Sequence, residues 1–164
     1  MSAAAGASAC GTSGPTPSSR VTPAIESSDP PQGNTNVGTL PTRRIQLLGR
    51  SFVVALAVTD EARSTGMSGW DLGDLRGIDG MLYVFDTPRE PGESYFSTSG
   101  YRFPVDILFF DSDGVFLRGY SVQPCPQGAN CRQYYPDQPF QYVIETPSGH
   151  LPILAPGAQL LVQS

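Results

Sequence analysis

Residues 104–122 read PVDILFFDSDGVFLRGYSV and carry the clearest β-hairpin signal of the chain. Two apolar runs of strand length flank DSDG, where Gly114 can take the left-handed backbone conformation that closes a hairpin built on a type I turn. Asp111 and Asp113 also have the spacing of the first ligands in a calcium loop. The later acidic ligands of such a loop are missing, so the segment predicts a turn between two antiparallel strands.

Asp106 lies inside the first of these apolar runs. In an extended strand its side chain shares a face with Leu108 and Phe110, where a carboxylate is costly to bury unless it is paired or hydrogen-bonded. Three roles stay open: a structural group held by backbone amides or an arginine, a ligand-binding carboxylate, or a catalytic acid or base. The arginines considered as its partners are Arg63, Arg102 and Arg118.

Apolar runs of strand length recur on both sides of the hairpin. Residues 44–59 predict two strands joined by a tight turn at 48–50, and further strands are expected in 80–88, 140–147 and 158–163. These runs are short and separated by glycine- and proline-rich turns. They indicate a mainly β (α+β) fold, a compact single domain of short antiparallel strands that is barrel-like or built of two packed sheets.

One short helix is expected near residues 60–66. In TDEARSTGM, Thr59 or Asp60 can serve as the N-cap, acidic residues follow in the first turn, and Gly66 can end the helix.

The first 42 residues differ in composition from the rest. They are rich in Ala, Gly, Ser, Thr and Pro, which predicts a disordered leader or tether over 1–42 and a β-rich globular domain over 43–164. Cys10 follows GASA and precedes GTSGPTPSS, a pattern that resembles the lipobox and spacer of a bacterial lipoprotein, although Ala7 stands where leucine is usual. Lipid attachment at Cys10 and a cysteine that lies there by chance both stay open.

The charge pattern argues against nucleic acid as a partner. The formal net charge is −5, with ten arginines and no lysine, so the chain lacks the basic surface that follows a phosphate backbone. It also contains no apolar run of the length that crosses a bilayer as a helix. Membrane association is therefore expected only through a lipid anchor.

Cys125 and Cys131 lie in the loop segment QPCPQGANCRQYYP. Their spacing favours a disulfide, which would place the protein outside the cytosol. Free thiols and a zinc site are the alternatives, but zinc requires three or four ligands and the only histidine is far along the chain. We expect no metal and no cofactor.

Five segments in register resemble the bacterial and archaeal family called domain of unknown function 192. They are TDEARSTGM, GMLYVF, FPVDILFFDSDG, QPC and YVIE, and the resemblance covers about residues 50–162. It implies a compact β-rich domain, often exported and tethered, without an assigned enzyme activity. The family usually carries Phe-Trp-Met-Lys-Asn-Thr before its Pro-Leu-Asp motif, whereas this chain has FSTSGY at 96–101. If the family's lysine and asparagine line a ligand site, this chain either binds a different ligand or has an inactive site.

On these grounds we expect an exported binding or accessory module of the cell envelope, either lipid-anchored or secreted, and monomeric. Its partner would be a small polar ligand, a glycan or an envelope protein. The residues expected at the ligand site are Asp106, Arg63, Phe96, Tyr101 and Arg102.

The alternative is a carboxylate-dependent hydrolase that uses Asp106 and a second acid. Glu145 is the candidate for that acid, and an ordinary charge at a strand end is the competing interpretation of Glu145. The chain has no recognisable nucleophile motif and no phosphate-binding glycine loop, so no catalytic residue is predicted.

Overall fold

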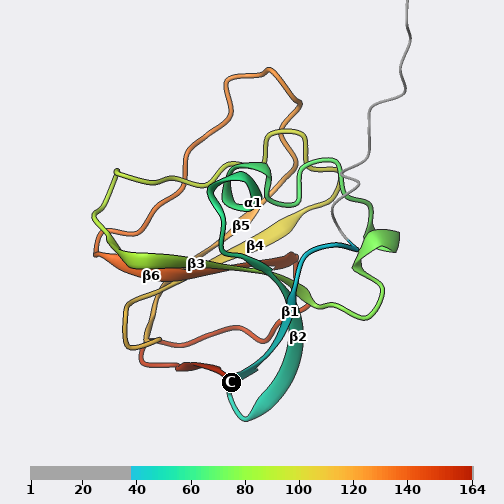
Figure 1. Cartoon of the computed structure of the whole chain (residues 1–164). Helices are drawn as coiled ribbons and strands as arrows, with labels where there is room; N and C mark the ends of the chain where they lie inside the picture. Colours follow the sequence, from blue (N-terminus) through green and yellow to red (C-terminus); the bar gives the residue numbers. More distant parts are fainter. Residues whose placement is uncertain (1–37, 164) are drawn as a thin grey trace, which may run out of the picture.

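The computed structural model describes residues 38–163 and contains one curled, seven-stranded mixed sheet (Figure 1). The strands are β1 (Thr42–Leu47), β2 (Arg50–Ala57), β3 (Gly80–Arg89), β4 (Val105–Phe110), β5 (Phe116–Val122), β6 (Phe140–Pro147) and β7 (Leu160–Val162). They lie side by side in the order β5-β4-β6-β3-β2-β1-β7. The helices of this part of the chain are α1 (Asp60–Thr65) and the 3-10 helix η1 (Leu72–Leu75). The predicted mainly β fold is confirmed.

The strand pairs are antiparallel with one exception, because β2 and β3 run parallel. The chain leaves β2, passes through α1 and η1, and returns to start β3 beside β2. A parallel neighbour requires a long crossover of this kind. Short antiparallel strands were expected from the sequence, and neither the parallel pair nor the 3-10 helix was predicted.

The two edges of the sheet meet, so that the curled sheet forms a partly closed barrel. An isolated bridge joins Val115, just before β5, to Gln159, just before β7. Beside it, the Leu160 N–H donates to the Gly114 carbonyl at 2.8 Å. Gly114 has φ 78°, and a Cβ atom there would lie 2.5 Å from the Leu160 carbonyl oxygen. The predicted turn glycine is thus also the residue that lets the two edges approach.

Local turn and capping signals are confirmed where they were predicted. The β1–β2 hairpin turns at Leu48 and Gly49, which both have positive φ. The side chain of Asp111 accepts hydrogen bonds from the backbone of its own turn. At α1, the Thr59 hydroxyl caps the helix start and Gly66 ends it.

Alternating side chains of the strands build two hydrophobic cores, one on each face of the sheet. Figure 1 shows α1 over one face of β3 and β6, with the β1–β2 hairpin and the C-terminus on the other side. The α1-side core consists of Ala55, Ala57, Met67, Trp70, Met81, Tyr83, Phe85, Phe96, Tyr101, Phe103, Val105, Ile107, Phe109, Val122, Phe140 and Val143. The β7-side core consists of Ile45, Leu47, Phe52, Val54, Leu56, Leu82, Leu108, Phe110, Ile144, Leu151 and Leu160.

Asp106 is half-buried at the rim of the β7-side core, where three donors surround its carboxylate. The hydroxyl groups of Ser121 and Ser148 donate to Oδ1 at 2.6 and 2.8 Å, and the Gly149 N–H donates to Oδ2 at 2.8 Å. These bonds join β4 to β5 and to the turn after β6. The contacts fit the structural role among the three that the sequence left open.

The arginines proposed as partners of Asp106 pair with other carboxylates. Arg63 contacts Asp60, Arg102 contacts Asp71 and Arg118 contacts Asp137. Hydroxyl groups and a backbone amide take the place of the expected guanidinium. Such groups have no sequence signature, since serine and glycine are common in turns.

Replacement of Asp106 by alanine tests this structural role. Alanine leaves the Gly149 N–H and the hydroxyl groups of Ser121 and Ser148 without their acceptor, so we expect the free energy of unfolding to fall by about 1–3 kcal/mol. Asp113→Ala, in the exposed β4–β5 turn, is the matched control. The measurement is thermal and denaturant unfolding of both variants, and equal midpoints would contradict the structural role.

Candidate functional site

Glu145 is a carboxyl buried in the middle of the α1-side core. It lies on β6 between Met81 of β3 and Ile107 of β4, and its exposed fraction is 0%. The side chains of β6 alternate, so Glu145 points to the same face as Val143. The interpretation as an ordinary strand-end charge is therefore wrong.

Two tyrosine hydroxyl groups hold one oxygen of this carboxyl. The Tyr83 hydroxyl donates to Glu145 Oε2, and the Tyr101 hydroxyl donates to the same atom at 2.5 Å. The Tyr101 oxygen in turn accepts the Met67 N–H at 3.2 Å. Three segments that are distant in sequence thus meet at Glu145 Oε2: β3, β6 and the loop before β4. The segment after α1 joins them through the Met67 N–H.

The other carboxyl oxygen, Oε1, has no hydrogen-bond partner among the described residues. Buried polar atoms are nearly always paired, and an unpaired one costs about 1–3 kcal/mol. Oε1 is itself enclosed by protein atoms, as are Trp70 Nε1 and Arg89 Nε, the other unpaired buried side-chain atoms of the described residues.

Burial decides the protonation of this group. Loss of water raises the pKa of Glu145 to about 7, although hydrogen bonds from Tyr101 and Tyr83 act in the opposite direction. Burial, followed by the nearby carboxylate charge, raises the pKa of both tyrosines well above the usual value of 10.0. Near neutral pH the carboxyl gains and loses its proton while both tyrosines remain donors.

A cleft of about 480 Å³ has Glu145 in its lining, and we call it the Glu145 cleft. Its volume falls in the range of small-molecule sites. Hydroxyl side chains dominate its walls: Ser64, Thr65, Ser68, Ser97 and Ser99. Exposed residues at its mouth include Tyr95 and Gln127.

Gly66 lets the end of α1 approach the tyrosine pair closely. A Cβ atom at this position would lie 2.5 Å from the Tyr83 hydroxyl and 2.6 Å from the Tyr101 hydroxyl. The positive φ of 52° also favours glycine. Helix termination and the close approach to the two tyrosine hydroxyl groups therefore depend on the same residue.

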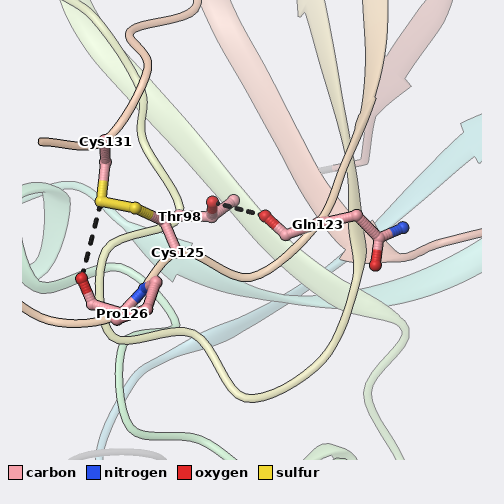
Figure 2. Close-up of a disulfide and its surroundings, with 5 residues drawn as sticks. All are labelled: Thr98, Gln123, Cys125, Pro126 and Cys131. Atoms are coloured by element: carbon pink, nitrogen blue, oxygen red, sulfur yellow. Dashed lines mark hydrogen bonds between the residues drawn. A yellow bond between two sulfur atoms is a disulfide. The ribbon is translucent and has the colours of Figure 1, made fainter. Parts of the chain in front are cut away.

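The predicted disulfide between Cys125 and Cys131 is present (Figure 2). An isolated bridge pairs Cys125 with Ser99, which lines the cleft. The Cys125 N–H donates to the Thr98 carbonyl at 3.1 Å, and the Gly100 N–H donates to the Cys125 carbonyl at 2.9 Å. The Thr98 hydroxyl also bonds the Gln123 carbonyl at 2.8 Å. The disulfide loop therefore holds the segment that carries Ser97 and Ser99.

The structure brings together some of the sequence-predicted site residues and separates others. Arg63, Phe96 and Tyr101 line the Glu145 cleft. Arg102 does not line it. Asp106 lies on the opposite face of the sheet, beside a separate groove. The ligand-binding roles of these residues stay predictions.

The described residues suggest no metal site and no membrane-spanning helix. Residues 38–163 contain no group of three or more His, Cys, Asp or Glu side chains placed to hold a metal ion. In the same range, no helix has the length and apolar character needed to cross a bilayer. Cys10 lies outside the described residues.

The profile of the DUF192 family, described as an uncharacterized ACR, matches residues 43–160. The chain belongs to the DUF192 family. The resemblance seen in the sequence motifs is thereby confirmed.

Two crystal structures share the fold. A Sinorhizobium meliloti 1021 protein, suggested to be a transcription regulator, is 25% identical, with a TM-score of 0.58 over 75% of this chain and 95% of its own. A protein of unknown function from Novosphingobium aromaticivorans DSM 12444 is 20% identical, with a TM-score of 0.56 over 74% of this chain and 86% of its own. No curated protein matches the chain significantly.

The segment in which this chain departs from the usual DUF192 pattern is a wall of the Glu145 cleft. Residues 96–101 supply Phe96, Ser97, Ser99 and Tyr101 to its lining. Ser99 stands where the family usually carries lysine. The difference noted in the sequence therefore changes the chemistry of this cleft.

Replacement of Glu145 by glutamine tests whether the buried carboxyl titrates as described. The folded pKa of about 7 lies above the ordinary 4.5, so the unfolded chain loses its proton first as the pH rises. Relative to Glu145→Gln, the wild type should lose up to about 3 kcal/mol of unfolding free energy between pH 4.5 and 7. At pH values above the pKa of Glu145 in the folded protein, the difference in unfolding free energy between the wild type and Glu145→Gln should no longer change with pH.

Denaturant unfolding at several pH values, followed by the fluorescence of the single tryptophan Trp70, measures this difference. Trp70 is fully buried, so its emission reports loss of the α1-side core. The exposed Glu90→Gln variant is the control and should keep the wild-type pH profile. Parallel profiles for the wild type and Glu145→Gln would show that the carboxyl does not titrate in this range.

Proposed function

We propose that this protein is an extracytoplasmic binding module that takes a small polar ligand in the Glu145 cleft. The cleft of about 480 Å³ whose lining includes Glu145 carries the proposal. The hydroxyl-rich walls of the cleft supply further polar contacts. Convergent polar groups of this kind in a preformed hollow are typical of small-molecule sites.

The arrangement of the acids supports binding rather than hydrolysis. Glu145 pairs with Ile107 across the sheet and Asp106 pairs with Thr146, so the two carboxyl groups point to opposite faces. Two acids that hydrolyse a glycosidic bond must flank that bond. Glu145 is also the single carboxyl in the lining of its cleft.

The disulfide supports an extracytoplasmic location, because such bonds persist in oxidising compartments. Lipid attachment at Cys10 would leave the β-rich domain on a tether at the membrane surface. The role suggested for the Sinorhizobium meliloti protein is not carried over, because a net charge of −5 opposes binding to a nucleic acid. The protein would act as a monomer toward a small ligand or an envelope protein.

Ligand capture tests the binding proposal. The purified full chain is equilibrated with the low-molecular-mass fraction of a bacterial envelope extract, and retained molecules are identified by mass spectrometry. Ser64→Trp fills the mouth of the cleft from an exposed helix position, and Ser112→Trp in the β4–β5 turn is the matched control. Retention by the wild type and the control, with loss in Ser64→Trp, is the expected result. No retained molecule, or equal retention by Ser64→Trp, would refute the proposal.

Metabolic labelling tests the anchor. An alkyne analogue of palmitate should label the full chain expressed in a bacterium, and Cys10→Ser should abolish the label. Ser13→Ala, in the same segment, should keep it. Equal labelling of the wild type and Cys10→Ser would rule out lipid attachment at this residue.

A further inference from the structure

The charge of the Glu145 cleft limits the ligands that it can take. Arg63 is the single cationic residue in its lining, and Glu145 is the single acid. Arg63 also keeps 13% of its side chain exposed, so its charge is felt in the cleft. A cationic ligand would meet a fixed positive charge and a carboxyl that is partly neutral near pH 7.

An anionic ligand would find Arg63 already engaged. Its Nη1 donates to the carbonyls of Val58 and Val84, both at 2.8 Å, and its Nη2 donates to Asp60 at 2.7 Å. These bonds attach α1 to the ends of β2 and to β3. The paired N–H groups that hold a carboxylate or a phosphate in a two-pronged contact are therefore occupied.

The walls match a ligand with many hydroxyl groups. Each serine or threonine hydroxyl both donates and accepts, as does the side-chain amide of Gln127 at the mouth. The ring of Tyr95, 55% exposed, provides an apolar surface beside these polar groups. A sugar ring has the same combination, because its hydroxyl groups project sideways and its C–H face can pack on an aromatic ring.

We propose that the ligand of the Glu145 cleft is a neutral saccharide that packs on Tyr95 and exchanges hydrogen bonds with the hydroxyl side chains of the walls. This inference rests on the proposed binding function and names its ligand class. It predicts selectivity for neutral sugars over aminated and acidic sugars of the same ring geometry.

Saturation-transfer NMR on the full chain tests this selectivity. The probes are glucose, galactose and mannose, compared with glucosamine, galactosamine, glucuronic acid and galacturonic acid. We expect at least one neutral hexose to bind about tenfold more tightly than its amine and acid counterparts. Tyr95→Ala should weaken this binding, whereas the exposed Tyr135→Ala should not.

The outcomes separate this inference from the proposed function. Tighter binding of an amine or an acid that Ser64→Trp abolishes would overturn the neutral-sugar assignment and leave the cleft as a binding site. No saturation transfer from any neutral hexose at tens of millimolar would also overturn the assignment. Unchanged binding in Tyr95→Ala would contradict the stacking contact. The capture experiment tests the proposed binding function separately, because it does not assume any class of ligand.

Discussion

The hydrogen-bonded burial of the Glu145 carboxyl is the constraint on which the α1 side of this protein depends. A carboxyl without water must receive hydrogen bonds from the protein. Tyr83 and Tyr101 supply them to Oε2, and Met67 fixes the position of Tyr101. The loop before β4 and the end of α1 are therefore held against the sheet by polar contacts as well as by packing. The remaining oxygen, Oε1, is the point at which this network stays incomplete.

Asp106 and Glu145 both lie in apolar strands, but the geometry of the sheet places their side chains in different surroundings. Asp106 and Glu145 lie on neighbouring strands, but their side chains leave the sheet on different faces. Asp106 reaches the rim, where two serine hydroxyl groups and a backbone amide surround it. Glu145 enters a core, where its donors satisfy only one oxygen. In the first arrangement both carboxyl oxygens accept hydrogen bonds, whereas in the second Oε1 is unpaired among the described residues.

The elements that could be predicted from the sequence are those with local causes. Thr59 and Gly66 delimit α1, and Gly114 specifies the β4–β5 turn, because caps and tight turns depend on a few adjacent residues. The parallel β2–β3 pair and the closure between Val115 and Gln159 depend on long-range contacts that no short pattern encodes. The disulfide was predictable because its two cysteines are close in sequence.

The site was only partly predictable for the same reason. Arg63, Phe96 and Tyr101 were singled out, but around Asp106 rather than Glu145. The alternation in FQYVIETP places Glu145 on the face of Val143, a signal equal to the one used for Asp106. The meeting of Tyr83 with Tyr101 depends on strand register and on the loop path, which the sequence does not specify. The burial of Glu145 could therefore be predicted from the sequence, but its hydrogen-bond partners could not.

The departure from the DUF192 pattern at residues 96–101 affects which charged and polar groups lie near Glu145. A lysine ammonium in place of Ser99 would add a second cation to the lining and favour the charged carboxylate of Glu145. Serine leaves the carboxyl with a raised pKa and gives the wall small groups that both donate and accept hydrogen bonds. Tyr101 stands where the family usually carries threonine, and it supplies a hydroxyl group to Oε2. The segment without the family's cation and amide thus adds hydroxyl groups, rather than charged groups, to the lining of the cleft.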